Sequence, residues 1–209
     1  MTYVAVLGTW AWPDDEDDRG LEWWQPTSAF AAMLRARGLD PVLPDDPFVW
    51  SGDLDGVPWL ANGRDWEAGA ANLAHYLRGL LPNDRNVIAH SHGGAVALFA
   101  ARRLPIRRLL TIGTPARKEV RAAARSALQS GHLGAWLHVH DASWDWMGSL
   151  GALFDGQLRL SRAMGLPGMT DLAIPRIGHS GLLAGGTLAD GAWQRHGLYD
   201  FLIGQDGHA

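Results

Sequence analysis

Apolar residues occur along this chain in two patterns. Some form short, nearly continuous runs, and others recur with helical spacing over longer stretches. The short runs predict about six strands, at residues 3–7, 41–43, 86–90, 106–112, 135–140 and 172–177. The longer stretches predict helices at residues 28–37, 64–81, 93–103, 117–129 and 192–203. Because strands and helices alternate, we expect an α/β domain in which a mostly parallel sheet is flanked by helices.

The length and composition indicate one folded domain that spans residues 1–209. Hydrophobic residues make up 47% of the chain and charged residues 19%, which is enough apolar surface for a sizeable core. The net charge is −4 and the basic residues form no stripe, so we expect no nucleic-acid partner. The absence of cysteine excludes disulfides, thiolate metal sites and a cysteine nucleophile.

Apolar runs in this sequence stay well below the roughly 18 residues that a membrane helix needs, so we expect no integral membrane segment. The first residues also lack the basic region and the long apolar stretch of a signal peptide. We therefore expect a cytoplasmic protein, and a secreted form would require that a leader had been removed. The sequence leaves the oligomeric state open.

Residues 86–94 place a serine between an apolar strand and a helix of small residues. A nucleophile on such a sharp turn needs small residues two positions before and after it, and Ala89 and Gly93 meet this requirement. The helix after Ser91 supplies a partial positive charge and the backbone N–H of His92, which can stabilise an oxyanion. The alternative is that Ser91 is an ordinary helix N-cap, a position that serine commonly occupies.

Four segments carry a further signal: residues 4–10, the turn Ala-His-Ser-His-Gly-Gly at 89–94, residues 109–115, and the loop at 175–183. In this order they resemble segments of the α/β-hydrolase superfamily and, more narrowly, of its small bacterial lipases and esterases. The resemblance implies a three-layer α/β-hydrolase fold with a minimal cap or none, a Ser91 nucleophile and a His179 base. It also assigns the oxyanion hole to the backbone N–H groups of Thr9 and His92. Leu7 stands where the family usually has a histidine.

The acid of the triad lies between the serine and the histidine in the chain order of this family. Two aspartates follow the strand predicted at 135–140, namely Asp141 and Asp145. The family's usual position, a few residues beyond the strand end and before an apolar pair, favours Asp145. Asp141 stays open as the alternative.

Tryptophan is unusually frequent, with 11 residues in the chain, many of them in its first third. These side chains serve either core packing or the apolar wall of a binding cleft. The candidates for a substrate pocket are Trp10, Trp12, Trp50, Trp144 and Trp146. The sequence thus predicts a serine hydrolase for small-molecule esters with apolar acyl or aryl groups. The alternatives are an acyltransferase or thioesterase with the same triad, and a non-catalytic binding protein of the same fold.

Two His-x-His patterns and one acidic run are the candidate metal ligands. His90 with His92, and His138 with His140, could ligate a divalent ion, but a barrel metallohydrolase needs such a pair near its N-terminus and about 250 residues. The acidic run at 14–18 lacks the spacing of an EF-hand. The first strand is followed by no dinucleotide-binding glycine pattern, and the chain has no P-loop. We therefore expect no metal and no cofactor.

Overall fold

Six parallel strands form the sheet of the computed structural model, which describes residues 1–8, 23, 25, 27–42, 63–142, 163–178 and 180–204. The strands are β1 (Thr2–Val6), β2 (Asp40–Val42), β3 (Asn86–His90), β4 (Ile106–Ile112), β5 (Leu133–Asp141) and β6 (Thr170–Ile174). Their order across the sheet is β2-β1-β3-β4-β5-β6, and every neighbouring pair is parallel. This confirms the predicted parallel sheet of about six strands.

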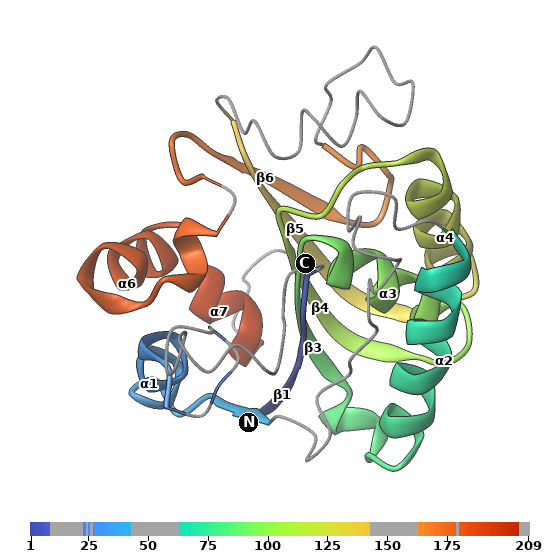
Figure 1. Ribbon diagram of the computed structural model, residues 1–209, viewed down its shortest axis with the longest axis horizontal. Helices are drawn as coiled ribbons and strands as arrows, with labels where there is room; N and C mark the ends of the chain where they lie inside the picture. The colour runs from blue at the N-terminus through green and yellow to red at the C-terminus, as the bar shows by residue number, and fades with distance from the viewer. Residues whose placement is uncertain are drawn as a thin grey trace.

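Helices cover both faces of the sheet and make the molecule three-layered (Figure 1). One face carries α1 (Ala29–Arg35), α6 (Gly186–Arg195) and α7 (Leu198–Ile203), and the other carries α2 (Gly63–Arg78), α3 (His92–Ala101) and α4 (Lys118–Gln129). Two short 3-10 helices, η3 (Pro82–Asp84) and η4 (Gly181–Leu183), complete the described elements. No separate cap domain is present among these residues.

The strands supply alternate side chains to two separate cores. On β1, Val4 and Val6 belong to the core under α2, α3 and α4, whereas Tyr3 and Ala5 belong to the core under α1, α6 and α7. Successive strand residues point to opposite faces, so a strand buried on both sides must be apolar throughout. This is why the central strands β3 and β4 are recognisable in the sequence as nearly continuous apolar runs.

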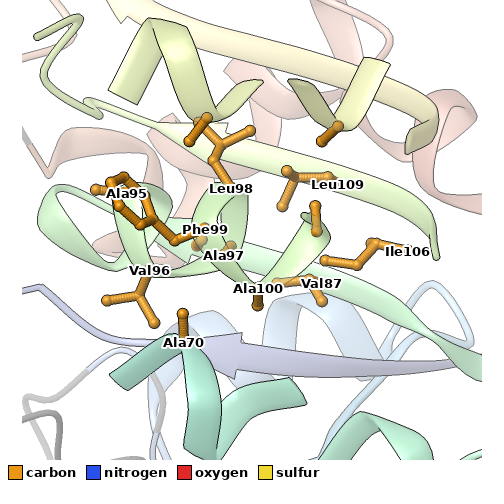
Figure 2. Close-up of a cluster of buried hydrophobic side chains, with 14 of the residues drawn as sticks. Ala70, Val87, Ala95, Val96, Ala97, Leu98, Phe99, Ala100, Ile106 and Leu109 are labelled. Atoms are coloured by element: carbon orange, nitrogen blue, oxygen red, sulfur yellow. The ribbon is translucent and has the colours of Figure 1, made fainter. Parts of the chain in front are cut away.

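Helix α3 is buried at all ten of its positions. It lies between the sheet, α2 and α4, and Figure 2 shows Val96 facing Ala70 of α2 while Leu98 lies on another side of the helix. Its run of glycine, alanine and other apolar residues permits this close approach. The position of α3 is therefore set by packing on every side.

Within the described parts of the chain, no helix is both long enough and apolar enough to cross a membrane.

The chain reverses its direction of winding between β1 and β3. From β1 it passes through α1 to β2 at one edge, and from β3 it passes through α3 on the opposite face to β4. In parallel sheets such a switch point leaves a crevice beyond the carboxyl ends of the two central strands, which is where ligands bind. Gly8 and Ser91 follow these two strand ends.

The predicted boundaries are wrong in two places near the C-terminus. The helix predicted at 192–203 is two helices, α6 and α7, because Gly197 between them adopts a left-handed conformation with φ 67°. The strand predicted at 172–177 is β6, which ends at Ile174, because Arg176 has φ 60° and turns the chain. This earlier turn shapes the loop that leads to residue 179.

Candidate active site

Ser91 forms the whole connection between β3 and α3, since β3 ends at His90 and α3 begins at His92. Its backbone has φ 52° and ψ −130°, a conformation that residues other than glycine rarely adopt. The Ser91 N–H donates to the carbonyl oxygen of Ile112 on β4 at 2.9 Å. The strained turn is thus held between a sheet strand and a fully buried helix, as a strand-to-helix nucleophile turn requires.

Glycines surround this turn at the points of closest approach. A Cβ at Gly93 would lie 2.5 Å from the carbonyl oxygen of Val6 and closer still to that of Leu7. A Cβ at Gly94 would overlap the side chain of Thr114. Gly93, two positions after Ser91, must therefore be small. The reason is that α3 begins directly against the backbone at the end of β1.

The side chain of Ser91 does not act as a helix cap. It makes no capping hydrogen bond to the described backbone of α3, whereas the Oγ of Ser28 accepts from the Ala31 N–H of α1 at 3.0 Å. Ser91 is also partly exposed, while Ser28 is buried. Ser91 therefore occupies the N-cap position of α3 without the side-chain hydrogen bond that an ordinary serine cap makes.

Of the two backbone N–H groups proposed for the oxyanion hole, the structure describes that of His92. His92 is the first residue of α3, and its ring is buried against Trp66 with 5.7 Å between ring centroids. Gly8 lies so close to the turn that a Cβ on it would be 3.0 Å from the Ser91 Cβ. The end of β1 therefore reaches the serine, although Thr9 itself lies outside the described residues.

Asp141 is the last residue of β5 and is buried, with 6% of its surface exposed. Its Oδ1 accepts the Arg176 N–H at 3.2 Å and its Oδ2 accepts the Gly178 N–H at 2.6 Å. The carboxylate thus holds the turn immediately before His179. The pairing of β5 with β6, which sets Asp141 opposite Ile174, brings the two segments together. Asp145 and His179 lie outside the described residues.

His90, the residue before Ser91, contacts the residue after His179. Its Nε2 and the Oγ of Ser180 share a hydrogen bond at 3.3 Å. The His90 ring is buried and packs edge-to-face on Trp23 with 6.3 Å between centroids. Sequence reasoning found neither this contact nor the bonds of Asp141, because no periodicity links residues 35 to 90 positions apart.

The histidine pairs do not form a metal site within the described residues, where no three potential ligands gather. His90 packs on Trp23 and His92 on Trp66, so each ring is already engaged in its own aromatic contact. The buried His138 is instead part of a polar network. Its Nδ1 shares a hydrogen bond with the Thr111 Oγ at 2.9 Å, and Trp136 donates to the same oxygen at 3.0 Å.

Four tryptophans of the described regions serve the cores. These are Trp23, Trp66, Trp136 and Trp193, each with at most 8% of its surface exposed. The five tryptophans expected around a substrate pocket all lie outside the described residues, namely Trp10, Trp12, Trp50, Trp144 and Trp146. The core-packing interpretation therefore holds for the first group, and the pocket stays a prediction for the second.

Comparison with known proteins gives a likeness of structure only. No family model and no curated protein matches the sequence. A crystal structure of an α/β-hydrolase enzyme from the metagenome of lagoon sediments at Mar Chica, Morocco, is similar with a TM-score of 0.55 and 14% identity, over 99% of this chain and 92% of that one. Acyl-protein thioesterase 2 of Zea mays gives a TM-score of 0.43 and 16% identity, over 68% and 64% of the two chains. Together with the strand order and the Ser91 turn, the first likeness shows that this chain has the α/β-hydrolase fold.

Proposed function

We propose that the protein is a serine hydrolase that cleaves carboxylic esters in the manner of lipases and esterases, with Ser91 as its nucleophile. The observation that carries this proposal is the backbone of Ser91, a strained residue other than glycine at the switch point of a parallel sheet. Strain of this kind persists where the surrounding structure enforces it, commonly at active sites. Ser91 is also partly exposed, as a nucleophile must be.

In the proposed reaction, the Ser91 Oγ attacks the ester carbonyl carbon while His179 takes the hydroxyl proton. His179 then gives that proton to the departing alcohol, which leaves an acyl group on Ser91. Water attacks the acyl-enzyme by the same route, and the carboxylic acid is released. The backbone N–H groups of His92 and Thr9 stabilise the oxyanion, and one such donor lowers the barrier by about 3 kcal/mol.

The start of α3 and the end of β1 support this oxyanion hole. The N-terminus of a helix carries a partial positive charge, and the His92 N–H lies in the first turn of α3. Gly8 lies against Ser91, and the resemblance assigns the second donor to the residue that follows it in the sequence, Thr9. Both donors are backbone groups, so the leucine at position 7 does not remove either of them.

The acid partner of His179 is Asp145 in this proposal, since the resemblance favours it. Asp141 is the alternative, and its contacts with the turn before His179 support it. A carboxylate has about four acceptor positions, so Asp141 could also accept the imidazole N–H while keeping its two backbone bonds. The two aspartates can be separated by paired substitution.

We propose apolar acyl or aryl esters as substrates, because the first third of the chain is rich in tryptophan and Trp144 and Trp146 stand beside Asp145 in the sequence. A panel of p-nitrophenyl esters from acetyl to decanoyl tests this with the purified protein. We expect hydrolysis that is lost in Ser91→Ala. Ser130→Ala is the control and should keep the activity, because the hydroxyl of Ser130 donates to the Ala127 carbonyl oxygen at the end of α4. Cleavage of charged or peptidic substrates without any cleavage of short acyl esters would contradict the proposal.

The same assay distinguishes an ester hydrolase from an acyltransferase or a thioesterase, which would form the same acyl-enzyme. Adding an alcohol acceptor and measuring the transesterified product detects an acyltransferase, and replacing the ester by an acyl thioester detects a thioesterase. We expect water to be the preferred acceptor and the oxygen ester the preferred substrate. A folded protein inert towards all of these would be a binding protein of the same fold.

A further inference from the structure

The chain on both sides of residue 179 is tied to the strands that carry the candidate site. Before it, Arg176 and Gly178 donate their backbone N–H groups to the carboxylate of Asp141 at the end of β5. After it, Ser180 bonds to His90 at the end of β3. Only one residue, number 179, separates these two attachments.

The attachment at Ser180 has a rigid support on the side of His90. His90 is paired in the sheet opposite Ile112, and its ring is buried against Trp23, so the position and orientation of its Nε2 are fixed. It is also the residue directly before Ser91. The contact therefore joins the turn at Ser91 to the loop at residue 180 through a side-chain hydrogen bond.

Ser180 is held from the other direction by η4. The Leu183 N–H donates to the Ser180 carbonyl oxygen at 2.9 Å, and Leu182 and Leu183 are buried in the core of that face. Trp193 of α6 donates its Nε1–H to the Leu182 carbonyl at 2.9 Å. The backbone of Ser180 is thus anchored by η4, and its hydroxyl bonds to His90.

We propose that His90 is a positioning residue, which acts through Ser180 to set the placement of His179 relative to Ser91. This rests on the proposed function, because it gives His179 the role of the base. A base must lie within hydrogen-bond reach of the proton that it takes, and a misplacement of about 1 Å costs on the order of 100-fold in rate. His90 itself takes no proton from the substrate or from Ser91.

Substitution of Ser180 tests this with little risk to folding, because Ser180 is exposed. Ser180→Ala removes the hydroxyl, whereas Ser180→Thr keeps one and is the matched rescue. For ester hydrolysis we expect Ser180→Ala to lower kcat about 10-fold with KM changed less than 2-fold, and Ser180→Thr to recover most of kcat. Ser130→Ala, which removes a serine hydroxyl far along the chain, should leave both parameters unchanged.

A second measurement does not depend on activity. In protein labelled with ¹⁵N at histidine, the imidazole signals of His90 and His179 are assigned from His90→Gln and His179→Ala. We expect Ser180→Ala to shift both sets of signals, and Ser180→Thr to restore both. A shift of the His90 signals alone, with those of His179 unchanged, would overturn the positioning role.

The kinetic and the NMR measurements together distinguish a failure of the positioning role from a failure of the proposed function. If the wild-type protein hydrolyses no ester but His90→Gln and Ser180→Ala both shift the His179 signals, the placement of His179 by His90 stands and the proposed function fails. If the wild type is active and Ser180→Ala keeps its full kcat, the proposed function stands and the positioning role is wrong.

Discussion

Gly93 of α3 lies against the carbonyl oxygen of Leu7, in the first turn after the candidate nucleophile. A methyl group at this glycine would overlap the backbone of β1, with the carbonyl carbon of Leu7 at only 2.8 Å. The obstacle is backbone in the centre of the sheet, which cannot move aside as a flexible side chain would. The close approach of α3 to β1 therefore depends on glycine at position 93.

Gly93→Ala should destabilise the protein by about 3 kcal/mol or more, since overpacking at this contact displaces α3 or β1. The matched control is Gly191→Ala in α6, where a Cβ would meet no described atom within 4 Å. That change should raise the free energy of unfolding by about 0.5–1 kcal/mol, because alanine is the better helix former. Urea unfolding followed by circular dichroism measures both, and equal effects would contradict the steric argument.

Tyr199 and Asp190 couple the stability of the protein to pH. The Tyr199 hydroxyl donates to Asp190 Oδ1 at 2.6 Å, and Arg37 lies 3.3 Å from the same oxygen. The hydrogen bond from Tyr199, followed by the charge of Arg37, lowers the pKa of Asp190. Burial, followed by the bond to Asp190, raises the pKa of Tyr199 above its usual range.

Tyr199→Phe should therefore lower stability in a pH-dependent way. The raised pKa of Tyr199 gives stability that is complete below about pH 10, the pKa of an unfolded tyrosine, and is lost as the pH rises towards the folded value. The lowered pKa of Asp190 gives stability that is present above about pH 4 and lost on acidification. Urea midpoints of both proteins at pH 3, 7 and 10.5 should differ most at pH 7, and a constant difference would contradict the coupling.

Asp141 and Asp145 should differ in their effect on the chemical step. Replacing a triad acid by asparagine lowers kcat by about 10⁴ in a comparable triad, because the histidine takes the wrong tautomer. We expect this loss for Asp145→Asn. Asp141→Asn should lower kcat by about 10- to 100-fold, through a looser turn at Arg176 and Gly178. Kinetics of both variants measure this, and a reversed order would make Asp141 the acid.

Most of the sheet could be predicted from the sequence because its central strands are buried on both faces. β3 and β4 have the predicted bounds, and both are apolar along most of their length, β4 apart from its arginine pair. β6 is an edge strand whose residues are largely exposed, so its apolar signal is weak and its predicted end was wrong. The break at Gly197 was missed because glycine inside a helical pattern does not by itself say which conformation it adopts.

The candidate site was predictable where its requirements are local. The small residues around Ser91 are a steric condition on a short segment, and the structure shows that condition at Gly93. The bonds of Asp141 to the turn at 176–178 and of His90 to Ser180 depend on which strands lie side by side. These contacts follow from the order of the strands in the sheet, and the pattern of apolar residues in the sequence does not give that order.

The most direct test of an activated serine is covalent labelling of the folded protein with a fluorophosphonate probe, followed by peptide mass analysis. Such a probe reacts with a serine whose hydroxyl is made nucleophilic by an adjacent base. We expect one adduct, on Ser91, that is absent in Ser91→Ala, strongly reduced in His179→Ala and unchanged in Ser130→Ala. A folded wild-type protein that forms no adduct, or one that is labelled on another serine, would contradict the assignment of Ser91 as the nucleophile.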